Sequence, residues 1–331
     1  MADRARILLP LLAVGTMLAL AGSLLIGPAG LMPRAVLGAL VDADAGTAAV
    51  VVREIRLPRT LLAAAIGATL GLSGAALQGY LRNPLAEPGL IGVSGAAALG
   101  AVLTLYTGAA AAFALALPLG GIAGAIAAVL LVLLLAGRHA DTLTLILAGV
   151  AVTSLAAALT SLALNLAPSP YAALEIVFWL LGSLSGRSME HVALALPFMA
   201  VGWALLASVG RALDALALGE EAAQSLGFHL AGVRVRLVLG TALSVGAATA
   251  VAGTIGFVGL VVPHALRPLV GHRPRALLPV SALGGALLLV LADILVRAVT
   301  PTNELKLGVV TALIGAPFFF ALVIRTRRGL A

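Results

Sequence analysis

The feature that most constrains this chain is a series of roughly ten apolar stretches, each long enough to cross a lipid bilayer as a helix of about 20 residues. Only 10% of its 331 residues are charged, against about 25% in globular domains, which excludes a water-facing surface. We expect an all-α polytopic membrane protein with a single transmembrane domain, residues 1–331. The predicted spans are 7–27, 60–81, 90–108, 113–136, 143–166, 191–209, 237–255, 257–270, 276–296 and 305–324.

The basic residues indicate how the chain is oriented in the membrane. With a cytoplasmic N-terminus, 13 of the 20 basic residues face the cytoplasm, and the positive-inside rule favours that arrangement. Both termini are then cytoplasmic. Residues 28–59 form a periplasmic loop, and residues 211–236 form the longest cytoplasmic segment. The seven basic residues on the outer side are Arg34, Arg53, Arg56, Arg59, Arg187, Arg297 and Lys306.

Several kinds of chemistry are excluded by what the sequence lacks. It has no cysteine, so disulfides and thiolate metal sites are excluded. Its one lysine, Lys306, follows Leu305, so there is no Gly-Lys-Ser/Thr loop for ATP. No His-Glu-x-x-His zinc motif occurs. We expect no catalytic residue, no metal site and no cofactor bound by this chain. The scattered basic residues also predict no nucleic-acid partner.

The 38 glycines need an explanation, because glycine is a poor helix former and offers lipid no side chain. Gly67 with Gly71, and Gly120 with Gly124, have the spacing that lets two helices approach closely. This predicts a tightly packed bundle with little room for a large internal cavity. A sizeable substrate path would then run between two copies of the chain, which predicts a homodimer.

Charged residues near the outer side are candidates for binding. Arg53, Arg56 and Arg59 lie within seven residues, and their planar guanidinium groups suit the carboxylates of an acidic partner that docks from outside. The alternative is that they reach lipid headgroups. Asp293 and Arg297 have the i, i+4 spacing of an ion pair on one helix face. An acid at membrane depth could instead serve a proton or sodium relay, which would need further acids.

Two cytoplasmic segments also attract attention. Two prolines and a glycine in residues 82–90 exclude a continuous helix, which predicts either a gate or a plain tight turn. Residues 218–227 predict a short helix between Gly219 and Gly227, whose apolar residues recur every fourth position. That helix would dock on a cytoplasmic partner or lie on the lipid surface.

Several motifs occur together between residues 50 and 325. They are Arg56-Leu57-Pro58-Arg59, Ser73-Gly74 with Gln78, Arg82 to Gly89 followed by Gly92-Val93-Ser94, Leu147-Ala148-Gly149, Leu218 to Gly227, Gly256 to His264, Leu291-Ala292-Asp293, and Glu304 through Gly308-Val309-Val310-Thr311 to Gly315-Ala316-Pro317-Phe318. In this combination the chain resembles the FecCD-type permease subunits of binding-protein-dependent ABC importers, which take up iron-siderophores, haem and cobalamin.

The resemblance implies a type II importer permease with ten spans and two inverted halves, working as a homodimer with substrate crossing at the interface. It implies two cytoplasmic ATPase subunits, which use ATP and Mg, bound at residues 216 to 229, and a substrate-binding protein docked outside on Arg56, Arg59 and Arg297. The residues expected to couple to the ATPase are Leu218, Gly219, Glu220, Glu221, Ala222, Leu226 and Gly227.

The resemblance also implies a cytoplasmic gate. In the cobalamin-transporting members the gate lies at positions that match Asn83 and Leu85, with a second constriction at positions matching Thr142 and Leu143. A small polar residue is expected where Leu143 stands, so this constriction differs here.

From these features we expect ATP-driven alternating access in the inner membrane of a bacterium. The cargo predicted first is an iron(III)-siderophore, with cobalamin or haem as alternatives. An ion-coupled secondary transporter is the alternative from another class.

Overall fold

The computed structural model describes residues 2–42, 46–111, 113, 115–137, 142–299 and 305–328. Over these residues the chain is helical and contains no strand, which confirms the all-α prediction. Within the described ranges, seven helices are long and apolar enough to cross a membrane, and four shorter apolar helices accompany them.

Ten helices in the described part of the chain fall on the ten predicted spans. They are α1 (Ala2–Leu25), α4 (Leu57–Tyr80), α5 (Val93–Tyr106), α6 (Ala116–Ala136), α7 (Thr142–Asn165), α9 (Met189–Ser208), α12 (Leu230–Ala252), α13 (Val258–Leu266), α14 (Pro274–Val299) and α15 (Leu307–Arg328). The seventh span ends three residues earlier than predicted, because Gly253 adopts a left-handed conformation (φ 75°) that terminates α12.

Further helices lie between these spans. They are α2 (Pro33–Val41), α3 (Thr47–Ala49), the π-helix η1 (Val50–Arg56), α8 (Pro170–Leu180), α10 (Gly210–Leu216), α11 (Glu220–Ser225), and the 3₁₀ turns η2 (Pro88–Ile91), η3 (Ala109–Ala111) and η4 (Arg267–Val270). The expected periplasmic loop 28–59 is therefore largely helical where it is described. Pro33 begins α2 and Pro170 begins α8, because proline is suited to the first helical position.

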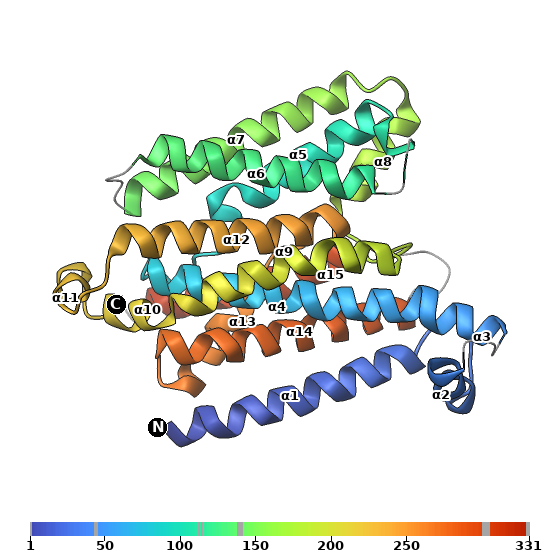
Figure 1. Ribbon diagram of the computed structural model, residues 1–331, viewed down its shortest axis with the longest axis horizontal. Coiled ribbons are helices and arrows are strands. Elements are labelled where there is room, and N and C mark those ends of the chain that lie inside the picture. Colours follow the sequence, from blue (N-terminus) through green and yellow to red (C-terminus); the bar gives the residue numbers. More distant parts are fainter. Residues whose placement is uncertain are drawn as a thin grey trace.

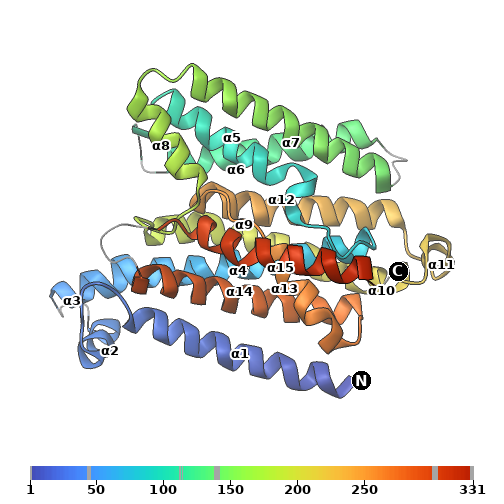
Figure 2. The ribbon, with the colours of Figure 1, turned by 180° about the vertical axis from the view of Figure 1, so that it is seen from behind.

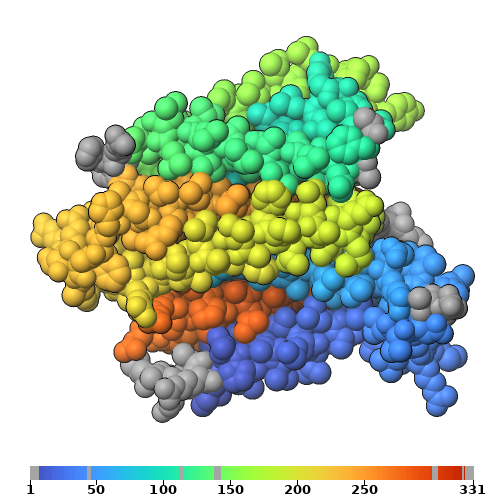
Figure 3. All heavy atoms as spheres, in the orientation of Figure 1, coloured from blue at the N-terminus to red at the C-terminus, as the bar shows by residue number. Residues whose placement is uncertain are grey.

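The helices run side by side along the long axis of the molecule (Figure 1, Figure 2). Helices α5, α6, α7 and α8 form one outer layer, α1 lies at the opposite edge, and α4, α9, α12 and α14 lie between them. In the space-filling view, α12, α9 and α14 form one continuous surface (Figure 3). Both termini lie at the same end as α11, while α2 and α3 lie at the other end. The predicted topology, with both termini on the side of the coupling segment, agrees with this arrangement.

Small residues hold the helices together, as the glycine spacing predicts. A Cβ atom on Gly67 of α4 would lie 2.2 Å from the carbonyl oxygen of Gly285 in α14. Between α5 and α6, a Cβ on Gly124 would lie 2.1 Å from the carbonyl oxygen of Ala96. Side chains at these positions would keep the backbones apart.

Burial shows which helices are central. In the helix Thr47–Tyr80, which contains α4, and in α12, 78% of the most apolar 18-residue stretch is buried, against 17% in α1. Helices α4 and α12 therefore form the centre of the bundle.

The chain leaves the helical conformation between α12 and α13. Phe257 has a positive φ of 66°, which is uncommon for a residue with a bulky side chain. The break is tied to its neighbours, because Ser183 N donates to Ala252 O (2.8 Å) and the Thr254 hydroxyl donates to Leu180 O. Figure 1 shows α12 ending short of the far ends of α9 and α14. The break therefore joins the end of α8 to the body of the bundle.

Candidate functional site

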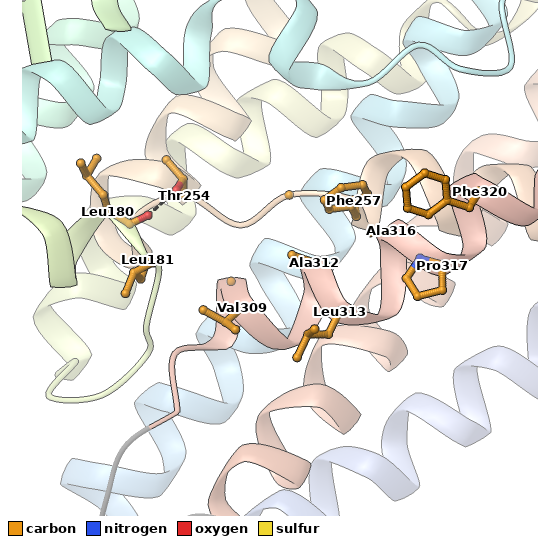
Figure 4. Close-up of a pocket in the computed structure, with 12 residues that line it drawn as sticks. Leu180, Leu181, Thr254, Phe257, Val309, Ala312, Leu313, Ala316, Pro317 and Phe320 are labelled. Carbon is orange, nitrogen blue, oxygen red and sulfur yellow. Dashed lines mark hydrogen bonds between the residues drawn. The ribbon is translucent and has the colours of Figure 1, made fainter. Parts of the chain in front are cut away.

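A hollow of about 570 Å³ opens on the side of the molecule between the end of α8, the α12–α13 break and α15 (Figure 4). We call it the α15 groove. Leu180 and Thr254 lie at one end, and Phe257 and Phe320 lie at the other. None of its 12 lining residues has an ionisable side chain. The groove therefore offers a mostly apolar surface and no ionisable side chain for acid-base chemistry.

Helix α15 turns large apolar side chains to the outside of the chain along this groove. Leu313 is 67% exposed and Phe320 is 68% exposed. The sequence analysis missed this face, because α15 is apolar on most of its surface and no polar face stands out against it. The pattern that could have revealed it is the recurrence of Val309, Leu313, Ala316 and Phe320 at intervals of four, three and four residues.

A cluster of charged side chains joins α1, α4 and α14 at the outer end of the bundle. Asp293 is fully buried, and its Oδ2 lies 3.1 Å from Arg297 Nε, so the predicted i, i+4 ion pair is present. Its Oδ1 accepts a hydrogen bond of 2.8 Å from Arg59 Nε, a contact that the sequence did not predict. Arg297 also donates to the carbonyl oxygens of Ser23 and Ile26, each at 2.9 Å. One carboxylate thus serves two guanidinium groups from different helices.

Two further outer arginines, Arg53 and Arg56, bind the ends of helices. Arg56 is 3% exposed and donates to the carbonyl oxygens of Leu24 (2.7 Å) and Leu25 (3.0 Å) at the end of α1. Arg53 donates to Ala39 O (2.7 Å) and Leu40 O (3.0 Å) in the last turn of α2. The last four carbonyl groups of a helix lack partners within the helix, and cations are favoured there.

The sequence predicted that Arg53, Arg56 and Arg59 present their guanidinium groups to the outside, and the structure differs. Helix ends or Asp293 engage all three of these groups. The role of Arg56, Arg59 and Arg297 in docking a binding protein stays a prediction.

The segment between α4 and α5, residues 81–92, is not a continuous helix, as its prolines predict. We call it the α4–α5 loop. Asn83 Oδ1 accepts a hydrogen bond of 2.9 Å from Leu85 N, which forms a tight turn with both residues exposed. Burial raises the pKa of Glu87 in the same loop.

The two positions expected to form the second constriction, Thr142 and Leu143, lie at the start of α7 together. Leu143 is 61% exposed, and the side chain of Thr142 lies outside the described residues. The gate role of these four positions stays a prediction.

The predicted short cytoplasmic helix is present as α11. Gly219 (φ 112°) precedes it and Gly227 (φ 86°) follows it, and both backbones are left-handed. Ala223 faces the core, whereas Leu218 and Leu226 are 73% and 62% exposed. Ala222 is half-buried between them, and Glu220 and Glu221 are exposed. An apolar surface with acidic neighbours is therefore open at the end of the molecule where the termini lie.

One further contact joins these two segments. Arg82 Nη2 in the α4–α5 loop lies 3.8 Å from Glu220 Oε1 at the start of α11. The residues are 138 positions apart, so no sequence spacing indicated the pair.

Within the described residues, no group of three or more His, Asp or Glu side chains could hold a metal ion.

Comparison with known proteins agrees with this architecture. The sequence profile of the FecCD transport family matches residues 11–325. This chain belongs to the FecCD family. It is 43% identical to the cobalamin import system permease protein BtuC of Halobacterium salinarum, over 84% of this chain and 74% of that protein. It is 42% identical to the Fe(3+) dicitrate transport system permease protein FecD of Escherichia coli, over 84% of this chain and 86% of that protein.

The three-dimensional comparison points the same way. A solved structure described as an inward-facing conformation of a metal-chelate type ABC transporter superposes with a TM-score of 0.85 and 33% sequence identity. The match covers 96% of this chain and 98% of that chain. The chain is therefore a multi-pass membrane protein of the FecCD family, whose members named above are permease subunits of ABC importers.

Proposed function

We propose that this FecCD-family chain is the membrane-spanning subunit of an ABC importer that moves a metal chelate inward between two copies of itself. The single observation that carries the proposal is the α12–α13 break on the wall of the α15 groove. Non-helical backbone at membrane depth is tolerated where it is buried in protein or faces a water-filled path, and not where it faces lipid. A second copy of the chain seated over the groove would shield the break from lipid and leave it facing protein or the substrate path between the two copies.

The chemistry of the groove fits a carrier that lets its cargo pass without holding it tightly. Its walls have no ionisable side chain, so no group there can carry a proton. This argues against the ion-coupled alternative, because Asp293 is already engaged by two arginines away from the groove. Energy must then come from partner subunits, and α11 offers the exposed apolar surface to which ATPase subunits would bind.

The cargo class follows from the relatives and from the groove together. The relatives named above transport cobalamin and ferric dicitrate, both of which are metal chelates. An iron(III)-siderophore is the first choice, and cobalamin and haem are the alternatives. A substrate-binding protein would deliver the chelate at the outer arginine cluster, by which we mean Arg56, Arg59 and Arg297. The expected location is the inner membrane of a bacterium.

The experiment is uptake by proteoliposomes that contain the chain, its ATPase and its binding protein. Labelled cyanocobalamin, ferric dicitrate, a ferric siderophore and haem are offered in parallel, with an ionophore present to remove ion gradients. We expect ATP-dependent uptake of one of them, and loss of uptake when the ATPase carries an inactivating substitution. Uptake by the chain alone, or uptake that the ionophore abolishes, would contradict the proposal.

A further inference from the structure

Arg82 occupies an unusual place at the end of α4. It follows the C-cap residue Leu81 and has a positive φ of 48°. A left-handed residue just after a helix is most often glycine, which has no Cβ to clash with the backbone. An arginine in this conformation persists where the surrounding contacts hold it. The contact made by its side chain therefore needs an explanation.

That side chain points to the segment expected to bind the ATPase. Arg82 Nη2 lies 3.8 Å from Glu220 Oε1, and the two side chains are 52% and 48% exposed. Glu220 is the first residue of α11 and directly follows Gly219, whose φ of 112° is accessible mainly to glycine. Movement of α11 would therefore displace Glu220 directly.

The path from Arg82 to the predicted gate is short and stiff. Asn83 is the next residue, and its side-chain oxygen accepts the backbone N–H of Leu85 at 2.9 Å. The backbone N–H of Ala86 donates to Asn83 O at 3.1 Å, and Ala86 is fully buried. Residues 82–86 thus form one hydrogen-bonded turn, anchored at its far end. A pull on the Arg82 side chain would tilt this turn and move Leu85.

Given the ATP-driven function proposed above, we propose that the Arg82–Glu220 ion pair transmits movement of α11 to the gate in the α4–α5 loop. Arg82 and Glu220 are positioning residues in this role, because they act through Asn83 and Leu85. An exposed ion pair is weak, so it can form and break in every transport cycle without trapping the protein in one state. The fully buried Asp293 cluster at the other end of the bundle could not be broken so easily.

The absence of cysteine in the sequence allows a direct test that needs no knowledge of the cargo. In the homodimer, a single Pro84→Cys substitution places one spin label in each α4–α5 loop, and their separation reports the gate. The complex of this variant with its ATPase is measured without nucleotide and after trapping with ADP and vanadate. We expect the label distance to change on trapping, and the change to fall to half or less when Glu220→Gln or Arg82→Gln is added.

Two further variants separate the ion pair from a merely structural effect. Glu221→Gln, which removes the neighbouring exposed carboxylate, should leave the nucleotide-dependent distance change intact. The charge exchange Arg82→Glu with Glu220→Arg should restore most of it. In uptake assays with the chelate that wild type transports, each neutral variant should reduce chelate moved per ATP by about two- to five-fold, as expected for an exposed ion pair.

The outcomes are distinguishable. If the label distance in the wild-type background does not respond to nucleotide, the ATP-driven function is contradicted, and the role of the ion pair with it. If the wild-type distance responds and Glu220→Gln responds equally, the proposed function stands and the role of the ion pair is overturned. Failure of the charge exchange to restore the change, with both single variants impaired, also overturns it.

Discussion

Arg59 Nε lies 2.8 Å from Asp293 Oδ1, and this ion pair joins α4 to α14 across 234 positions of sequence. The same carboxylate contacts Arg297 at 3.1 Å. Asp293 thus holds together two helices and, through Arg297 and the Ser23 carbonyl, a third. The cluster that the sequence predicted to face a docking protein is also a structural junction of the bundle.

Removing the charge of Asp293 should therefore destabilise the fold. Asp293→Asn leaves two largely buried guanidinium groups without their carboxylate, and breaking a buried pair by removing one partner costs about 3 kcal/mol or more. We expect a lower thermal unfolding midpoint for the detergent-purified homodimer. Glu54→Gln, which neutralises an exposed acid near the same end of the molecule, is the matched control. Equal midpoints for the two variants would show that Asp293 is not the junction.

Charge at Arg59 should matter for docking as well as for stability. The Arg59 side chain is 12% exposed, so we expect a carboxylate of the binding protein to reach its edge while Asp293 still holds it. We expect Arg59→Gln to weaken binding-protein docking at least about tenfold, because a partly desolvated charge pair is lost. Reversal of both Arg56 and Arg59 to Glu should abolish docking and uptake.

Basal ATPase activity of the complex shows whether Arg59→Gln is still folded, and it should be largely retained because Arg297 still pairs with Asp293. The double reversal places acids beside the buried Asp293 and the carbonyl end of α1, so we expect it to be destabilised as well. Arg34→Gln, an exposed arginine in α2, is the control. If Arg59→Gln binds the docking protein as tightly as Arg34→Gln does, the outer arginine cluster is only structural.

Much of the fold followed from the sequence because lipid imposes a simple rule. A helix that crosses the bilayer alone needs about 20 apolar residues, and all ten predicted spans correspond to helices, of which α5 and α13 are shorter than this. Close helix contacts at Gly67 and Gly124 were predictable for a similar reason, since only small residues allow them. The short helix α11 was predictable from the two glycines that bound it.

The remaining features depend on contacts between distant parts of the chain. Arg59 meets Asp293, and Arg82 meets Glu220, only after the bundle has formed, so no local spacing reveals them. The inward direction of Arg56 depends on where α1 ends. Helix α2 lies in the predicted periplasmic loop 28–59, yet Pro33 and the Arg53 contacts at its end stabilise it.

A methyl group at Gly67 should separate α4 from α14. The added Cβ would lie 2.2 Å from Gly285 O and 2.9 Å from Ala286 Cα, both of which are backbone atoms that cannot rotate away. We expect Gly67→Ala to destabilise the protein by about 1 to 3 kcal/mol, as overpacking usually does. Gly22→Ala in α1 has no atom within 4 Å of the new Cβ and should be neutral or slightly stabilising. Similar thermal midpoints for the two variants would contradict the close packing.

The half-buried Glu87 should make stability depend on pH. Burial raises its pKa in the folded state, so the folded protein binds this proton more tightly than the unfolded chain does. Stability from this group is present below the ordinary carboxyl pKa of about 4.3 and is lost as pH rises through the higher folded value. We expect Glu87→Gln to unfold at a higher temperature than wild type at pH 7. The difference should vanish near pH 4, and a constant difference between the two pH values would exclude this titration.

The α15 groove makes a prediction about the dimer that needs neither cargo nor partner proteins. Because the chain has no cysteine, Leu313→Cys places a single thiol per copy on the exposed face of α15. If two copies meet over this groove, a short bis-maleimide should convert the variant in membranes into a covalent dimer. Leu134→Cys in α6 is the control, since Leu134 is 77% exposed and α6 and α15 lie toward opposite faces in Figure 1 and Figure 2. Both thiols face apolar surroundings, so lipid exposure alone would make them react alike. A dimer interface along α15 therefore requires that Leu313→Cys forms the covalent dimer and that Leu134→Cys does not.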